Sequence, residues 1–125
     1  MLTLATGVID LKSDLPDRTF TFAKRIVKLC QTLEEQRGVA QTLGRQLIRS
    51  GTSVGANIEE GQASHSRKDF ALKCNIACRE ARETLYWLRL IAETDIVPAD
   101  RLKSLMEECN ELIAILTTIV KKVRE

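Results

Sequence analysis

The chain has 125 residues, enough for one domain that buries a core without disulfides or metals. Hydrophobic residues make up 44% of the chain and charged residues 29%, a balance that excludes a disordered protein. The formal net charge of +2 indicates nucleic-acid binding only if Lys and Arg cluster locally.

The first residues give no sign of export or membrane insertion. No apolar run reaches the ~18 residues that a membrane span needs, and the first ten residues lack the basic start of a signal peptide. We therefore expect a cytoplasmic protein without membrane association. The cysteines are expected to be reduced core residues, with a four-cysteine zinc site as the alternative. They are Cys30, Cys74, Cys78 and Cys109.

Met1–Pro16 shows no helical period, so we predict an extended N-terminal arm that docks on another surface. From Asp17 the apolar residues recur every three or four positions, and Gly38 suits the end of this first helix. Its predicted core residues are Phe22, Ala23, Ile26, Leu29, Cys30 and Leu33.

A second helix is predicted from about Val39 to Ala63. Each interior Gly costs roughly 1 kcal/mol relative to Ala, so Gly51 and Gly55 indicate close approach of a neighbouring backbone. A helix break near Gly51 is the alternative, but the apolar phase is the same on both sides of it. The predicted core stripe is Leu43, Leu47, Gly51, Val54 and Ile58.

The third helix is predicted from Arg67 to about Glu93, because Ser66 and Asp69 form a start similar to a capping box. Ala77 and Ala81 are small, so we expect this helix to pack tightly on the glycines of the second. Its predicted core stripe is Phe70, Cys74, Ala77, Cys78, Ala81, Leu85, Leu88 and Ile91.

Pro98 and Asp100 suit the first turn of a fourth helix that ends near Arg124. Its predicted core residues are Leu102, Leu105, Met106, Cys109, Leu112, Ile113, Leu116, Val120 and Val123. Four amphipathic helices with short connections predict an all-α, antiparallel up-and-down four-helix bundle over residues 17–125, preceded by the arm over 1–16.

The third helix also carries a second apolar stripe that points away from this core. Such a stripe is unusual for a monomer, so we expect a homo-oligomer in which another subunit covers it. Trp87 folding over the shoulder of its own bundle is the alternative. With two small outward residues of the second helix, the candidate interface is Leu72, Ile76, Tyr86, Trp87, Leu90, Thr52 and Ala56.

No catalytic constellation is present, so we expect neither enzyme activity nor a cofactor. His65 is the only histidine and lies in a predicted corner, without a paired nucleophile. The Gly51–Gly55 segment lacks the Lys-Ser/Thr ending of a phosphate loop. Glu59 and Glu60 could suggest a metal site, but the Glu-x-x-His pairs of di-iron bundles are missing, so we expect no metal.

Pairs of basic residues on the predicted helices are the candidate nucleic-acid contacts. Solvated charge is the alternative, but a symmetric oligomer would repeat each pair into a larger basic surface. Binding would then depend on phosphates and on salt. The candidates are Lys24, Lys28, Arg45, Arg49, Arg67 and Lys68.

The segment Gln46–Gly61, QLIRSGTSVGANIEEG, resembles the signature of the proteins encoded by intervening sequences in bacterial 23S rRNA genes. Ser66–Phe70 and Glu83–Leu88 continue the similarity, which covers about Asp17 to Arg124. The matching positions include Arg45 and Arg49, together with the motif residues Gly51, Gly55, Asn57, Glu60 and Gly61.

This resemblance implies a left-handed up-and-down bundle that assembles as a ring-like homopentamer with a basic surface. A related group comprises the accessory proteins of diversity-generating retroelements, which bind a reverse transcriptase and nucleic acid. The family has no known catalytic residues. We therefore expect a non-catalytic protein that binds RNA or a ribonucleoprotein. The alternative is a protein-interaction adaptor, such as an accessory subunit of a reverse transcriptase.

Overall fold

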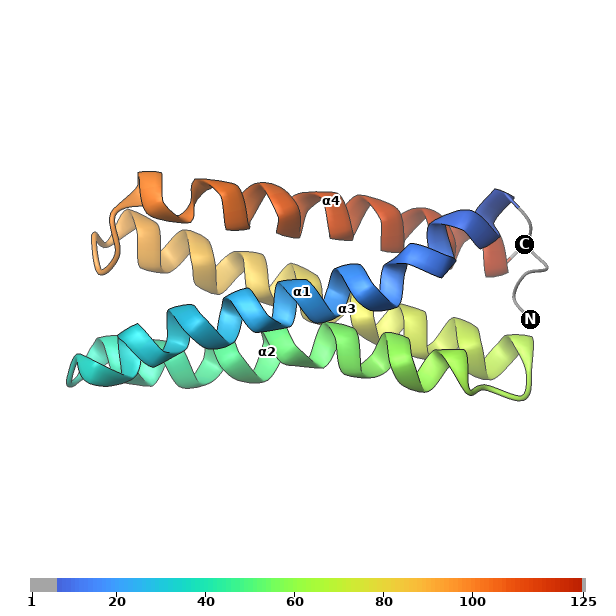
Figure 1. Cartoon of the computed structure of the whole chain (residues 1–125), viewed down its shortest axis with the longest axis horizontal. Coiled ribbons are helices and arrows are strands. Elements are labelled where there is room, and N and C mark those ends of the chain that lie inside the picture. The colour runs from blue at the N-terminus through green and yellow to red at the C-terminus, as the bar shows by residue number, and fades with distance from the viewer. Residues whose placement is uncertain (1–6, 125) are drawn as a thin grey trace.

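The chain forms four helices, α1 (Gly7–Glu35), α2 (Val39–Gln62), α3 (Arg67–Glu93) and α4 (Ala99–Arg124), which run alternately up and down (Figure 1). This computed structural model describes the backbone of residues 7–124 and the side chains of residues 14–123. Successive helices pack side by side, whereas α1 and α4 share a smaller contact. The predicted all-α bundle is confirmed, and residues 7–124 contain no strand.

The prediction of an extended arm is wrong for residues 7–16, which form the start of α1. Residues 1–6 lie outside the described part of the chain. Pro16 lies inside the helix, although it cannot donate the usual backbone hydrogen bond. Extending an existing helix costs much less than nucleating one, so α1 continues through a segment that has no clear apolar period of its own. These first turns run at an angle to the rest of the helix (Figure 1).

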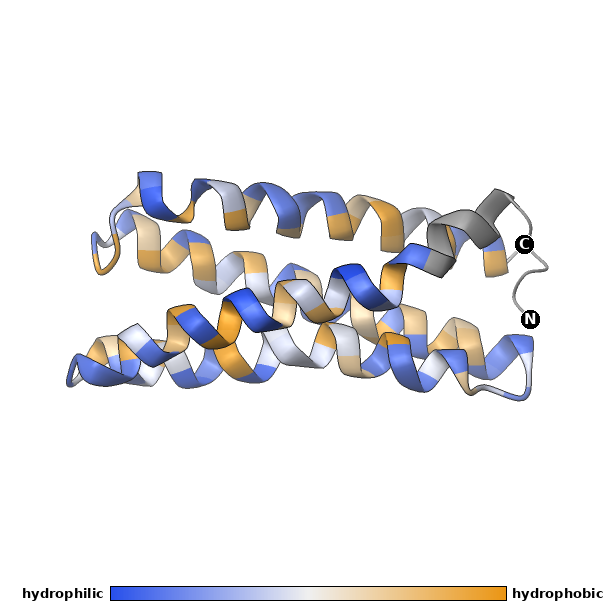
Figure 2. Ribbon diagram, in the orientation of Figure 1, coloured by the Kyte–Doolittle hydropathy of each residue, from blue (hydrophilic) through white to orange (hydrophobic). Residues whose placement is uncertain are grey.

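Hydrophobic and hydrophilic residues alternate along each helix, as a bundle with one interior requires (Figure 2). Most predicted core residues are buried, but Ala23, Leu29, Leu43, Leu85, Met106, Ile113 and Val123 are only partly buried. Among the described side chains, five buried hydrophobic residues were not predicted, namely Leu15, Ala40, Ala92, Val97 and Ile119. Leu15 is 3% exposed and lies in the segment assigned to the arm, and Ile119 is fully buried in α4.

The second and third helices pack closely, as predicted, but the close approach at Gly51 and Gly55 is made by α1 and not by the small residues of α3. A Cβ at Gly51 would lie 2.8 Å from both Cγ atoms of Ile26, and one at Gly55 would lie 3.2 Å from the carbonyl oxygen of Thr19. Gly44 has the same relation to Leu33, at 3.1 Å. Small residues on α2 therefore accommodate large or backbone groups of α1.

The helix ends follow the local sequence. Gly38 has a φ of 82°, a conformation that favours glycine, and it separates α1 from α2. The Ser66 hydroxyl accepts a hydrogen bond of 3.0 Å from the backbone N–H of Asp69, which confirms the predicted cap of α3. His65 is exposed in this corner, as predicted.

Candidate assembly and nucleic-acid surfaces

The signature segment lies on α2, where several of its side chains bond within the bundle. Ser50 and Thr84 of α3 are fully buried, and their hydroxyl oxygens lie 2.9 Å apart. The Asn57 amide donates to the backbone oxygen of Ser53 at 2.9 Å. These contacts give the small and polar residues of the motif a structural role in packing α2.

The end of the motif is tied to the first turns of α3. Glu60 forms an ion pair of 2.7 Å with Lys73. A Cβ at Gly61 would lie 3.3 Å from the Cβ of Lys73 and 3.4 Å from the Phe70 ring. Glycine at this position therefore allows α3 to return close to α2 directly after the corner.

Arg49, a candidate nucleic-acid contact, is engaged by carboxylates of α3. Its guanidinium lies 3.4 Å from Glu80 and also pairs with Glu83. Glu83 in turn accepts a hydrogen bond of 2.9 Å from the Trp87 indole. An RNA phosphate would have to compete with both carboxylates for Arg49. Arg45, by contrast, has only a 3.9 Å contact with Glu34, and both side chains are exposed.

The other candidate cations lie on different elements. Lys24 and Lys28 are exposed on α1, where the Lys24 ammonium stands 5.3 Å from the centre of the Phe20 ring. Arg67 donates to the backbone oxygens of Lys122 and Val123 near the C-terminus of α4, at 3.3 and 3.4 Å. Lys68 is exposed beside it. The six candidates are thus divided among three helices, with two each on α1, α2 and α3.

The predicted interface residues differ in how far they are exposed. Leu72 is 54% and Tyr86 56% exposed, and Ala56 is exposed on α2. Ile76, Leu90 and Thr52 are half-buried, and the Thr52 hydroxyl donates to the backbone oxygen of Ile48. Their role in assembly remains a prediction.

Trp87 is partly buried and packs against the hydrophobic core, as the alternative interpretation of this residue expected. Its ring meets that of Tyr86 edge-to-face, with centroids 5.1 Å apart. Tyr86 is thus the exposed ring of a contacting pair, and Trp87 is the ring that packs on the core.

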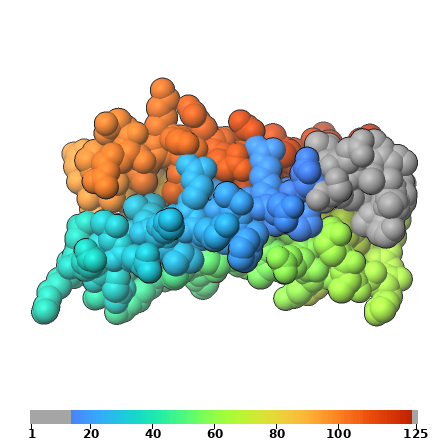
Figure 3. Space-filling view, viewed as in Figure 1, coloured from blue at the N-terminus to red at the C-terminus, as the bar shows by residue number. Residues whose placement is uncertain are grey.

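Within residues 14–123, three exposed large apolar residues were missed by the sequence analysis, and one of them, Val39 at the start of α2, is 67% exposed. Phe20 on α1 is 54% exposed, and Ile48 on α2 is 37% exposed. Phe20 lies one residue after Thr19 and two before Phe22, and both of these are buried. Phe20 is therefore out of step with the apolar spacing of α1, and this offset is the signal that could have identified it as exposed. In the space-filling view, α1 lies between α4 and α2 (Figure 3).

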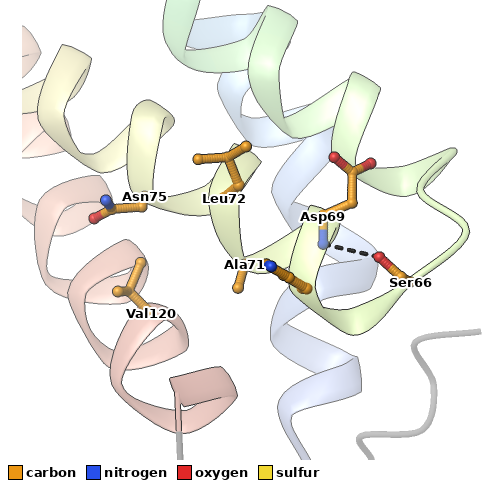
Figure 4. A pocket seen from close by; sticks show the side chains of 7 residues that line it. Ser66, Asp69, Ala71, Leu72, Asn75 and Val120 are labelled. Atoms are coloured by element: carbon orange, nitrogen blue, oxygen red, sulfur yellow. Dashed lines mark hydrogen bonds between the residues drawn. The ribbon is translucent and has the colours of Figure 1, made fainter.

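A shallow pocket of about 460 Å³ lies between the first turns of α3 and the last turns of α4 (Figure 4). Ala71, Leu72 and Val120 supply apolar surface, and the Ser66 hydroxyl is already bonded to the cap N–H. Lys68 and Asp69 bring opposite charges to the rim. The pocket therefore suits an apolar group better than an anion.

The cysteines are free thiols and all are buried. Burial raises the pKa of Cys30 to about 11 and that of Cys109 to about 12. Within residues 14–123 no group of three His, Cys, Asp or Glu side chains is placed to hold a metal ion. Across the described helices, none combines the length and apolarity needed to cross a bilayer.

Comparison with known proteins identifies relatives of the whole bundle. Residues 12–118 match the family model described as 23S rRNA-intervening sequence protein. The chain is also similar to the crystal structure of a protein of unknown function from the S23 ribosomal protein family of Bacteroides thetaiotaomicron. The two share 38% sequence identity and a TM-score of 0.79, over 86% of this chain and 98% of that one. No curated protein matches the chain. Because the family model spans most of the sequence, the chain belongs to the 23S rRNA-intervening sequence protein family.

Proposed function

We propose that the protein is a non-catalytic, oligomeric bundle of the cytoplasm that binds RNA mainly through its backbone phosphates. The observation that carries this proposal is a set of exposed cations without carboxylate partners. Lys24, Lys28 and Lys68 have no described carboxylate oxygen within 4.0 Å. A phosphate can bind such side chains without breaking an ion pair. The family description, 23S rRNA-intervening sequence protein, also links the family to ribosomal RNA.

Assembly is proposed from the exposed apolar side chains. Leu72 and Tyr86 lie on α3, whereas Phe20 and Ile48 lie on α1 and α2. A ring joins two different surfaces of neighbouring subunits, whereas a twofold dimer joins a surface to itself. Two separate apolar surfaces therefore favour a ring, and the pentamer implied by the resemblance is one such ring. Each ring would repeat the cations and strengthen polyanion binding through multivalency.

A filter-binding titration with two unrelated structured RNAs tests RNA binding. We expect similar affinity for both RNAs and a steep loss of affinity between about 50 and 200 mM salt, because phosphate contacts release counterions. Undetectable binding at the low-salt end would refute the proposal. The titration uses the wild-type protein first. Reversing the charge of Arg49 would place a new carboxylate beside Glu80 and Glu83, so that variant would not isolate the contact with RNA.

The pocket beside Leu72 supports an adaptor as the second candidate function, since its apolar walls could receive a side chain of a protein partner. The partner class proposed here is a reverse transcriptase encoded near the gene. Co-expression and co-purification would test it, with Leu72→Glu expected to abolish the complex. Retention of such a partner by a protein that does not bind RNA would favour the adaptor.

A further inference from the structure

Three exposed arginines form a row on the side of α3 that faces away from α2. Arg79, Arg82 and Arg89 are spaced by three and seven residues, so they fall on one side of the helix. At 1.5 Å per residue, the row is about 15 Å long.

The row adjoins the outer side of α4. The Arg82 guanidinium donates to the Thr117 hydroxyl at 3.3 Å, and that hydroxyl also lies 3.5 Å from the Cys78 sulfur. On α4, Lys103 and Lys121 are exposed and lie 18 residues apart. Eighteen residues make five helical turns, so both lysines project from the same side of α4. We call these five cations, Arg79, Arg82, Arg89, Lys103 and Lys121, the α3–α4 cationic face.

In the middle of α3, acidic and basic residues face different neighbouring helices, α2 and α4. Glu80 and Glu83 pair with Arg49 on the α2 side, whereas Arg82 bonds toward α4. Within residues 14–123, no carboxylate oxygen lies within 4.0 Å of any cation of the α3–α4 cationic face. Glu93 lies one turn beyond Arg89, and Glu107 lies on α4 between Lys103 and Lys121, so two carboxylates stand beside the five cations. The face is therefore a local excess of positive charge on a chain with a net charge of only +2.

An exposed aromatic ring lies within the same row. Tyr86 is four residues after Arg82 and three before Arg89, and it is 56% exposed. Its edge-to-face contact with the half-buried Trp87 ring limits the orientations available to it. Cations that follow a backbone and an aromatic side chain that can stack on a base are the combination used to bind single-stranded nucleic acid.

We infer that the α3–α4 cationic face is the principal RNA-binding surface, with its cations on the phosphates and Tyr86 stacked on an unpaired base. This inference rests on the proposed function, and it places the site on α3 and α4 instead of around Arg45 and Arg49. Arg45 has a distant carboxylate partner and Arg49 has two closer ones, so their charge is partly neutralised within the protein.

Neutralising variants of equal charge change can locate the binding surface. Arg79→Gln combined with Arg89→Gln removes two cations but leaves the bond from Arg82 to Thr117 intact. We expect RNA affinity at about 50 mM salt to fall roughly tenfold or more. The slope of log affinity against log salt should decrease by about 1.4–1.8, for two lost phosphate contacts. Arg37→Gln combined with Arg101→Gln is the matched control, because both side chains are exposed and lie outside the candidate contacts and the α3–α4 cationic face. It should have a much smaller effect.

Two further variants probe the rest of the surface. Lys103→Gln combined with Lys121→Gln tests the α4 side, and it also covers the case in which the α3 variant alters folding or assembly. Tyr86→Leu should weaken binding of single-stranded RNA roughly fivefold or more, because a stacking ring is lost. It should leave the salt slope unchanged, since no charge is removed. Circular dichroism and light scattering verify the fold and mass of every variant.

The outcomes separate this inference from the proposed function. If the wild-type protein fails to bind RNA, the proposed function fails. If it binds RNA but the control at Arg37 and Arg101 loses as much affinity as the variants of the α3–α4 cationic face, the inference is overturned and the proposed function stands. Equal salt slopes for the wild type and both variants of the face would overturn the inference as well.

Discussion

Gly55 of α2 lies against the backbone of Thr19 in α1, so that a Cβ at Gly55 would stand only 3.2 Å from the Thr19 carbonyl oxygen. Thr19 itself is fully buried, and its hydroxyl donates to the Leu15 carbonyl oxygen at 2.8 Å within the same helix. The neighbour of Gly55 is thus a backbone held in a helix, which has little freedom to move aside. This contact sets how closely α1 and α2 approach.

Replacing Gly55 by Leu should destabilise the protein by about 1–3 kcal/mol or more, because the larger side chain overpacks the contact with Thr19. The gain in helix propensity, about 1 kcal/mol, offsets only part of this loss. Urea denaturation at fixed protein concentration measures the change. Glu59→Leu, one turn away on the exposed surface, is the control and should change stability little. Equal stability of Gly55→Leu and the parent would contradict close packing here.

The Ser50–Thr84 pair should stabilise the fold, because each buried hydroxyl is a hydrogen-bond partner for the other. Thr84→Val keeps the side-chain shape but leaves Ser50 with only a 3.4 Å contact to the Leu47 carbonyl oxygen. We expect a loss of about 1–3 kcal/mol in the free energy of unfolding. Adding Ser50→Ala should cost little more, because the unpaired hydroxyl is then removed. Strict additivity in this double-mutant cycle would show that the two hydroxyls do not interact.

Alkaline pH should destabilise the folded chain through its buried thiols. Burial raises the pKa of Cys109 to about 12, above its ordinary value of 9.0. An unfolded thiol therefore loses its proton first, and its contribution to stability is complete below pH 9 and is lost as pH rises toward 12. The slope is at most about 1.4 kcal/mol per pH unit for one thiol.

The comparison for this pH dependence is Cys109→Ala, which lacks the titrating group. Its free energy of unfolding should fall less steeply between pH 9 and 11 than that of the parent, although its stability is lower at every pH. Urea titrations at each pH give both slopes. Identical slopes would mean that the thiolate of Cys109 is not suppressed in the folded state.

Light scattering should give the wild-type protein a mass several times 14.0 kDa, because other subunits would cover the exposed apolar side chains in the proposed oligomer. Leu72→Glu and Phe20→Glu should each lower this mass, since each places a charge in an apolar contact. Both residues are 54% exposed, so neither change should damage the folded subunit.

Trp87→Glu is a poorer test of assembly, because Trp87 packs on the core and would affect folding as well. Thr118→Glu, on the exposed part of α4, is a suitable control and should leave the mass unchanged. A wild-type protein that is monomeric at micromolar concentration would contradict the assembly proposal.

The sequence by itself determined the number of helices, most of their ends and most of the core. These features are local, because they depend on apolar residues at helical spacing and on caps such as Ser66 and Gly38. The third helix was predicted from Arg67 to about Glu93, and α3 spans these residues. The one large error, at the start of α1, arose because the helix extends through Pro16 without a periodic apolar pattern.

Only the tertiary structure decided which helix meets the glycines of α2 and which cations are paired. Spacing placed Gly51 and Gly55 on an inner face but could not tell α1 from α3, since both neighbours border that face. In the sequence, Glu80 and Glu83 lie more than 30 residues after Arg49, so nothing indicated that they pair with it. Arg49 was therefore kept as a candidate nucleic-acid contact. The energy of an ion pair depends on the distance between its two charges. For charges on different helices, that distance is fixed only when the bundle forms.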